Sequence, residues 1–169
     1  LIKAAENGSG SAQLLLGKIL WDATEEEEFD GLTKRIGLEY LKCAANQGSW
    51  QASYIYGYSR YSMTEVKADW ADASKYLNLA LSNEDTTAEH RIHILNALAT
   101  MSLWGGDGIK KNISQAQEYI SLAEEIHSTA NTKNKPLSLG NTEPLESIDI
   151  ESHPELRQVL LKGSSEDQE

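Results

Sequence analysis

Small and aromatic residues recur along the chain with the spacing of a helix. Two alanines and a tyrosine lie at i, i+3 and i+7, and the same residue types return 43 positions later (73 to 116). These positions are Ala73, Tyr76 and Ala80, then Ala116, Tyr119 and Ala123. Residues at this spacing share one helical face. Because small residues let a neighbouring helix approach closely, the pattern predicts the second helix of a repeated helical hairpin.

Signals for helix ends repeat with a period of 40 (12 to 52). Alanines and glycines carry this period. Ala12 and Gly17 recur as Ala52 and Gly57, and Ala4 and Gly8 recur as Ala44 and Gly48. Glycine ends helices readily because it adopts a left-handed conformation, and a period of this size is typical of a solenoid. Thr33, Asp69 and Asn112 are the predicted N-caps of the second helices.

These patterns predict an all-α fold, an α-solenoid of about three antiparallel helix-turn-helix repeats with a C-terminal extension. We expect the repeat domain at 1–127, with the end of one repeat at 1–8 and units at about 9–48, 49–84 and 85–127. The first helix of the third unit should run to about Trp104, after a capping box of Thr86 and Glu89. Composition predicts a polar linker at 128–152, a short helix at 153–162 and a disordered acidic tail at 163–169.

A motif in the third unit carries a resemblance to a known family. The motif is Gly106-x-Gly108-Ile109, then Asn112 and the alanines and tyrosine given above. With it, the chain resembles the Sel-one-like repeat family, a subclass of the tetratricopeptide-type helical repeats, over roughly residues 1–127. Gly37 stands where that family usually has alanine. The resemblance implies a right-handed superhelix of antiparallel helix pairs that acts as a protein-binding scaffold or adaptor, with no catalytic residues.

Charge and cysteine content restrict the partners and the compartment. The net charge is −11 and the isoelectric point is near 4.8, which argues against nucleic acid or an anionic membrane and permits a basic protein partner. The one cysteine, Cys43, cannot form an internal disulfide and is expected to be a small buried hydrophobe. It favours the cytoplasm over a periplasmic or secretory compartment. No apolar run is long enough to insert into a membrane. Since the chain begins at Leu1, we expect a fragment or a processed form.

Candidate chemical groups give little support to catalysis or metal binding. His90 and His93 lie at i, i+3, whereas the helical zinc motif places histidines at i, i+4. We therefore expect exposed or partner-facing histidines and no metal, cofactor or catalytic site. The glycines at 105–108 lack the Gly-Lys-Ser/Thr ending of a phosphate loop and are read as a turn between helices.

The candidate binding surface is a stripe of aromatic residues in the first helix of the middle unit. The stripe comprises Trp50, Tyr54, Tyr58 and Tyr61, at i, i+4, i+8 and i+11. The other units have leucine and lysine, or alanine and methionine, at the places of Tyr54 and Tyr58, so the stripe is not a requirement of the repeat. Trp21, Tyr61 and Trp104 do recur at equivalent helix ends, which indicates packing. Arg60 and Lys18 are expected to flank the stripe.

Two interpretations of the stripe stay open: it binds a partner on the concave surface, where first helices lie, or it fills gaps beside smaller neighbours. If it binds a partner, alanine at Tyr54 and Tyr58 should weaken binding and change the melting temperature little. The leading function is a non-enzymatic protein- or peptide-binding adaptor. The alternatives are an acidic inhibitor or immunity-type protein that blocks a basic partner and, less favoured, a hydrolase built on His90 or His93. The sequence leaves the oligomeric state open.

Overall fold

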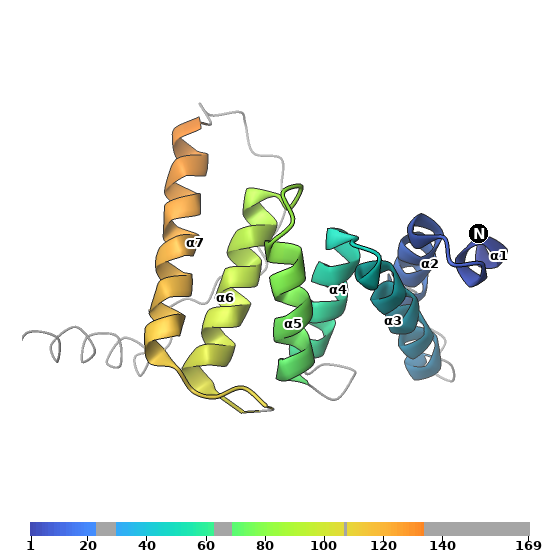
Figure 1. Ribbon diagram of the computed structural model, residues 1–169, viewed down its shortest axis with the longest axis horizontal. Coiled ribbons are helices and arrows are strands. Elements are labelled where there is room, and N and C mark those ends of the chain that lie inside the picture. The colour runs from blue at the N-terminus through green and yellow to red at the C-terminus, as the bar shows by residue number, and fades with distance from the viewer. Residues whose placement is uncertain (23–29, 63–68, 107, 134–169) are drawn as a thin grey trace, which may run out of the picture. The chain divides into compact units, whose positions relative to one another are not determined.

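The computed structural model describes residues 1–22, 30–62, 69–106 and 108–133, which form seven α-helices (Figure 1). The helices are α1 (Ile2–Glu6), α2 (Gly10–Asp22), α3 (Asp30–Asn46), α4 (Trp50–Tyr61), α5 (Trp70–Leu81), α6 (Ala88–Trp104) and α7 (Ile113–Lys133). All of them belong to one compact unit that ends at residue 134. The predicted linker from residue 134 onward, the short helix at 153–162 and the tail at 163–169 lie outside the described residues.

The helices pair as three hairpins, α2 with α3, α4 with α5, and α6 with α7. The hairpins stack through α3 against α4 and α5 against α6, while the first helices α4 and α6 also contact each other directly. The predicted all-α helical solenoid is thereby confirmed. The right-handed superhelix stays a prediction.

Helix ends repeat as the sequence period suggests. Gly8 and Gly48 have φ of 88° and 92°, a backbone conformation that glycine adopts without a steric penalty. At each glycine the next amide bonds back across the helix end, from Ser9 to the Ala4 carbonyl and from Ser49 to the Ala44 carbonyl. These bonds close the Schellman type of helix end. The same termination 40 residues apart shows that α1 is equivalent to the end of α3.

Helices α2 and α3 cross at a point where neither backbone carries a side chain. A Cβ added to Gly17 would lie 3.0 Å from the Gly37 carbonyl oxygen and 2.8 Å from Leu41 Cγ. A Cβ on Gly37 would in turn lie 3.0 Å from the Gly17 carbonyl oxygen. Gly57 plays the same part between α4 and α5, where a Cβ would lie 3.0 Å from the Leu77 amide nitrogen. An alanine at Gly37 would therefore crowd the backbone of α2.

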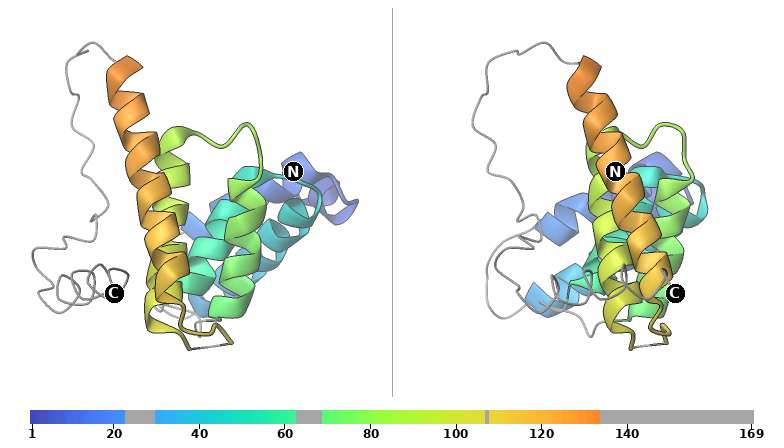
Figure 2. Two further views of the ribbon diagram at one scale, coloured as in Figure 1. Left: turned by 60° about the vertical axis from the view of Figure 1, so that its left-hand side comes forward. Right: turned by 90° about the vertical axis from the view of Figure 1, so that its left-hand side faces the viewer.

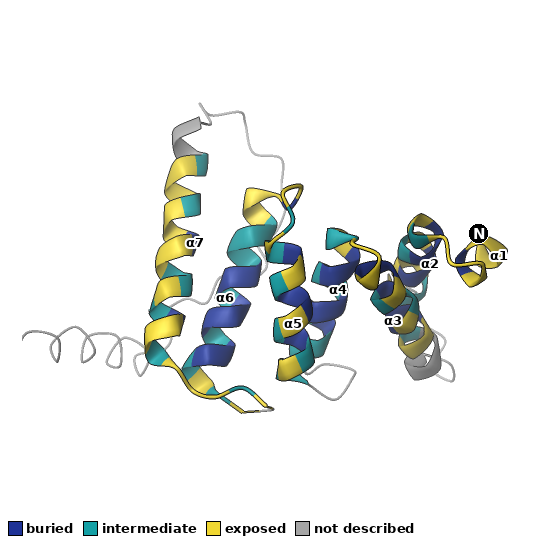
Figure 3. Ribbon diagram, viewed as in Figure 1, coloured by how far each residue is buried: buried dark blue, intermediate teal, exposed yellow. Residues whose placement is uncertain are grey.

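The core runs along the inner sides of the hairpins, and the outer side of α7 is largely exposed (Figure 3). One cluster lies between α3 and α4 and continues to Tyr76 of α5, and a second joins α5 to α6. The repeat positions inside helices are buried except for the half-buried Tyr119; these are Ala12, Gly17, Ala44, Ala52, Gly57, Ala73, Tyr76, Ala80, Ala116 and Ala123. Gly48, Gly106 and Gly108 are exposed turn residues with positive φ.

Helix α6 ends at Trp104, as predicted, but two expected N-caps are wrong. The cap of α6 is Thr87, whose side chain accepts a hydrogen bond from the His90 amide. Thr86 is buried instead, and its hydroxyl donates to the Ala80 carbonyl at the end of α5. Helix α3 begins at Asp30, so Thr33 lies one turn inside it. Asp69 and Asn112 do cap α5 and α7.

Two further expectations are corrected. Helix α7 continues to Lys133, past the expected boundary at 127, and its last turns extend beyond the first turn of α6 (Figure 2). Ser128 and Thr129 are tolerated in the helix because both hydroxyls donate to the Glu125 carbonyl, at 2.8 and 3.0 Å. Cys43 is exposed rather than buried, because Leu41 and Ala44 define the inner face of α3 and Cys43 lies outside it.

Candidate functional site

The aromatic stripe of α4, comprising Trp50, Tyr54, Tyr58 and Tyr61, lies beside the buried face of that helix. The helix begins after Ser49, whose hydroxyl accepts a hydrogen bond from the Ala52 amide. Its fully buried residues, among them Ala52, Tyr56 and Gly57, pack between α3 and α5. The stripe is rotated away from them, and all four of its members are half-buried. Each side chain of the stripe is therefore partly packed against the protein and partly exposed to solvent.

Rings of the stripe form a continuous series of contacts along α4. The ring centroids of Tyr54 and Tyr58 lie 5.8 Å apart, and those of Tyr58 and Tyr61 lie 5.5 Å apart. Tyr61 then meets Trp70 of α5 at 6.2 Å. These separations lie within the range in which aromatic pairs attract beyond their burial. Each ring consequently restrains its neighbours.

Two histidines of α6 hold one edge of the stripe. The His90 ring stands edge-on to Tyr54, at 4.8 Å between centroids and 86° between planes, and edge-on to Trp50 at 5.1 Å. Nδ1 of His93 lies 3.4 Å from the Tyr54 hydroxyl oxygen. The expected exposed or partner-facing histidines are thus half-buried contacts between the second and third units. Trp50 and Tyr54 therefore have a packing role as well.

An open groove runs between α2 and α4. It has a volume of about 300 Å³. Lys18, Trp21 and Asp22 of α2 line one wall, and the other wall comprises Tyr54, Ile55, Tyr58 and Ser59 of α4, with Ser62 just beyond it. Lys18, Tyr54 and Tyr58 are thus brought together, and Trp50 and Tyr61 continue the same stripe beyond the groove. The volume is at the lower end of the range for ligand pockets.

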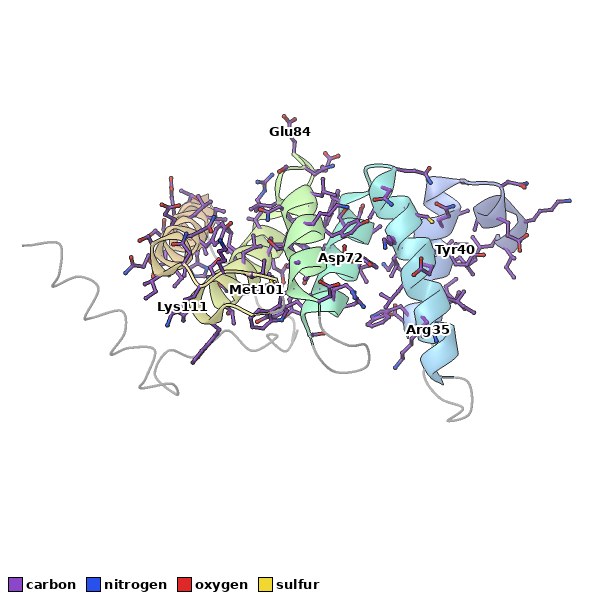
Figure 4. The ribbon with its side chains drawn as sticks, turned by 60° about the horizontal axis from the view of Figure 1, so that its bottom comes forward. Arg35, Tyr40, Asp72, Glu84, Met101 and Lys111 are labelled. Carbon is purple, nitrogen blue, oxygen red and sulfur yellow. The ribbon has the colours of Figure 1, made fainter. Side chains whose placement is uncertain are left out.

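Arg60 does not flank the groove. Its Nη2 lies 3.3 Å from an Asp69 carboxylate oxygen and its Nε lies 3.9 Å from Oδ2 of Asp72, the residue labelled in Figure 4. Tyr56 donates a 2.6 Å hydrogen bond to the same oxygen of Asp72. The pKa of Asp69 is lowered, mainly by the hydrogen bond from the Asp72 amide and further by Arg60. Arg60 therefore joins α4 to the start of α5.

The tyrosines of the groove stay neutral across the physiological range. Burial raises the pKa of Tyr54 to about 12, with smaller contributions from Tyr58 and Glu89. Burial also raises the pKa of Tyr58, and Tyr61 adds to the effect. Both side chains consequently present a hydroxyl that donates and accepts hydrogen bonds.

His90 and His93 of α6 are the candidate groups for metal binding or hydrolysis. Among the ranges given above, no three His, Cys, Asp or Glu side chains are placed to hold a metal ion. A second open groove of about 290 Å³ does bring His93 together with Glu89 and His127, between α6 and α7. Its remaining lining residues are Ala88, Ile92 and Ala130, so none of the six carries a hydroxyl or thiol nucleophile. Within the same ranges, no helix is long and apolar enough to cross a membrane.

Sequence reasoning missed part of this site. Trp21 was assigned to packing, and it does contact the core cluster between α3 and α4, but it also forms a wall of the groove. A signal existed, because Trp21 lies three residues after Lys18 and so on the same helical face. Asp22, four residues after Lys18, carried the same signal, whereas Ser62 follows the last residue of α4 and had none.

Comparison with known proteins supports the fold. No family model matches the chain, and no curated protein matches it. Among solved structures, a Sel1 repeat protein from Oxalobacter formigenes is similar to it, with a TM-score of 0.54 and 20% sequence identity. The match covers 73% of this chain and 32% of that chain, so this chain spans about a third of its neighbour. The resemblance predicted from the motifs is thereby confirmed at the level of the fold: this is a Sel1-like repeat fold.

Proposed function

We propose that this chain is a non-enzymatic scaffold or adaptor that binds a protein or peptide partner on the face where α2, α4 and α6 lie. The observation that carries the proposal is the groove between α2 and α4, whose aromatic wall does not recur in the repeat. At the places of Tyr54 and Tyr58 the third unit has Ala97 and Met101, and both are buried. The tyrosines are therefore not what the stacking of units demands.

The composition of the wall suits recognition of a protein. Tyrosine and tryptophan dominate the residues that contribute most to binding, because they supply a large rigid surface with a polar tip. Here three such rings, Trp21, Tyr54 and Tyr58, face one open groove. They are already held by packing, so binding costs them little conformational entropy.

Site-specific photo-crosslinking tests the proposal. A photoreactive phenylalanine analogue replaces Tyr58 in the groove or, as the control, Trp104, which is 57% exposed at the equivalent helix end of the third unit. In extracts of the source cells, we expect position 58 to capture a defined protein band that position 104 does not. Mass spectrometry then identifies the crosslinked segment. Equal labelling at both positions, or none at 58, would contradict a binding role for this face.

A further inference from the structure

The hydrogen-bonding groups that line the groove between α2 and α4 favour some conformations of a bound peptide over others. Three of the eight residues that line it are aromatic, and the backbone amides inside α2 and α4 are engaged in their own helices. The carbonyl oxygens of a bound peptide can therefore find hydrogen-bond donors only among side chains. Among the described residues, no hydrogen bond joins the Trp21 indole or the Tyr58 hydroxyl to another group. The groove thus offers these two groups, together with the Lys18 ammonium, as donors to peptide carbonyl oxygens.

A polyproline II segment meets these demands. Its carbonyls are free because the conformation has no internal hydrogen bonds, and proline carries no N–H that would lose its water in the groove. Prolyl rings also pack on tyrosine and tryptophan faces, as in other aromatic-lined grooves for proline-rich segments.

Charge indicates what accompanies the prolines. Asp22 is the anionic residue of the groove, and the whole chain has a net charge of −11. A basic residue beside the prolines would meet Asp22 and would be drawn to the acidic chain. Lys18 lies one turn before Asp22 on α2, and its ammonium group can donate a hydrogen bond to a peptide carbonyl oxygen.

We propose that the groove between α2 and α4 binds a proline-rich segment of a partner protein, in the polyproline II conformation and with a basic residue beside the prolines. This inference rests on the proposed peptide-binding function and assigns it a ligand class. Trp21, Tyr54 and Tyr58 hold the prolines, and Asp22 selects the basic residue.

A displayed library of random peptides tests the ligand class without assuming it. The whole chain is the bait, and sequencing compares peptides retained by the wild type with those retained by Tyr58→Phe and Trp21→Ala variants. We expect the retained peptides to be rich in proline with an adjacent arginine or lysine, and to be depleted on both variants. Retained peptides without proline that are also depleted on the variants would overturn the polyproline proposal and leave peptide binding at this face standing. If the chain retains no peptide of any composition, both proposals fail.

A peptide of defined sequence measures how much each side chain of the groove contributes to the binding affinity. A polyproline peptide with arginine at each end is titrated by calorimetry. Tyr58→Phe removes one hydrogen bond and should weaken binding about 2- to 10-fold. Trp21→Ala removes a wall and should weaken it at least about 10-fold, whereas Trp104→Ala, at the equivalent place of the third unit, should not change it. Melting curves show that each variant is folded. A probe that does not bind, or that binds these variants and the wild type equally, overturns the proposal.

Discussion

Replacement of Tyr54 by alanine separates the packing role of the stripe from its binding role. Tyr54 is half-buried, and its ring is edge-on to His90 at 4.8 Å. Full burial of a large apolar side chain stabilises by about 1.5–3 kcal/mol, and an aromatic pair adds about 0.5–1.5 kcal/mol. Partial exposure places the burial contribution near the lower end of its range. We therefore expect Tyr54→Ala to lower the free energy of unfolding by about 2–3 kcal/mol.

The assay is urea denaturation and thermal melting followed by far-ultraviolet circular dichroism. For a chain of this length, each kcal/mol lowers the melting temperature by about 2–4 °C, so the expected decrease is about 4–12 °C. Tyr54→Phe keeps the ring and loses only a long contact of 3.4 Å to His93, so it should change stability by less than about 0.5 kcal/mol. Trp104→Ala, at an exposed position, is the matched control.

This expectation differs from the one drawn from sequence, in which a stripe that only binds a partner would change the melting temperature little when Tyr54 and Tyr58 are replaced by alanine. If Tyr54→Ala unfolds within about 0.5 kcal/mol of the wild type, the contact between α4 and α6 does not stabilise the stack. The stripe would then be a binding surface alone, and the packing argument made for His90 would be wrong.

Three more outcomes test the reasoning. Gly17→Ala should destabilise by about 1–2 kcal/mol in urea, because overpacking against Leu41 and the Gly37 carbonyl outweighs the helix propensity gained; equal or greater stability would contradict the close helix crossing. Thr87→Ala should cost about 1 kcal/mol by loss of the α6 cap, and an unchanged urea midpoint would argue against it. Absorbance at alkaline pH should show Tyr54 ionising last among the groove tyrosines, near pH 12. Since its folded pKa is raised above the ordinary tyrosine value of 10.0, its contribution to stability is complete below that value and is lost as pH rises through about 12.

Much of the fold could be predicted because the same residue pattern occurs in several repeats. The alanine–tyrosine–alanine pattern located α5 and α7, and the Gly8 and Gly48 endings recur in the structure with the same backbone bonds. What failed was local: Thr86 and Thr87 are both threonines, and only the chain path decides which hydroxyl faces the helix and which faces Ala80. Sequence spacing cannot make that choice.

The site was only partly predictable, for geometric reasons. Tyr54 and Tyr58 lie four residues apart on one face of α4, and Lys18 aligns with Tyr58 through the repeat period of 40 (18 to 58), as the sequence shows directly. Arg60 stands two residues after Tyr58, about 200° around the helix at 3.6 residues per turn, so it points to the start of α5. The contact of Tyr54 with His90 joins residues 36 positions apart (54 to 90) and has no copy elsewhere in the repeat, so no internal comparison reveals it.

The first helices do not all meet in the same way. Helices α4 and α6 contact each other, with Tyr54, His90 and His93 between them, and Met101 of α6, labelled in Figure 4, is buried. Between α2 and α4 there is an open groove, and Tyr54 and Tyr58 also line it. The stripe therefore packs against α6 of the third unit and also lines the groove beside α2 of the first unit. Because the stripe packs on the third unit, its rings are already ordered before a ligand enters the groove. Binding therefore loses less side-chain conformational entropy.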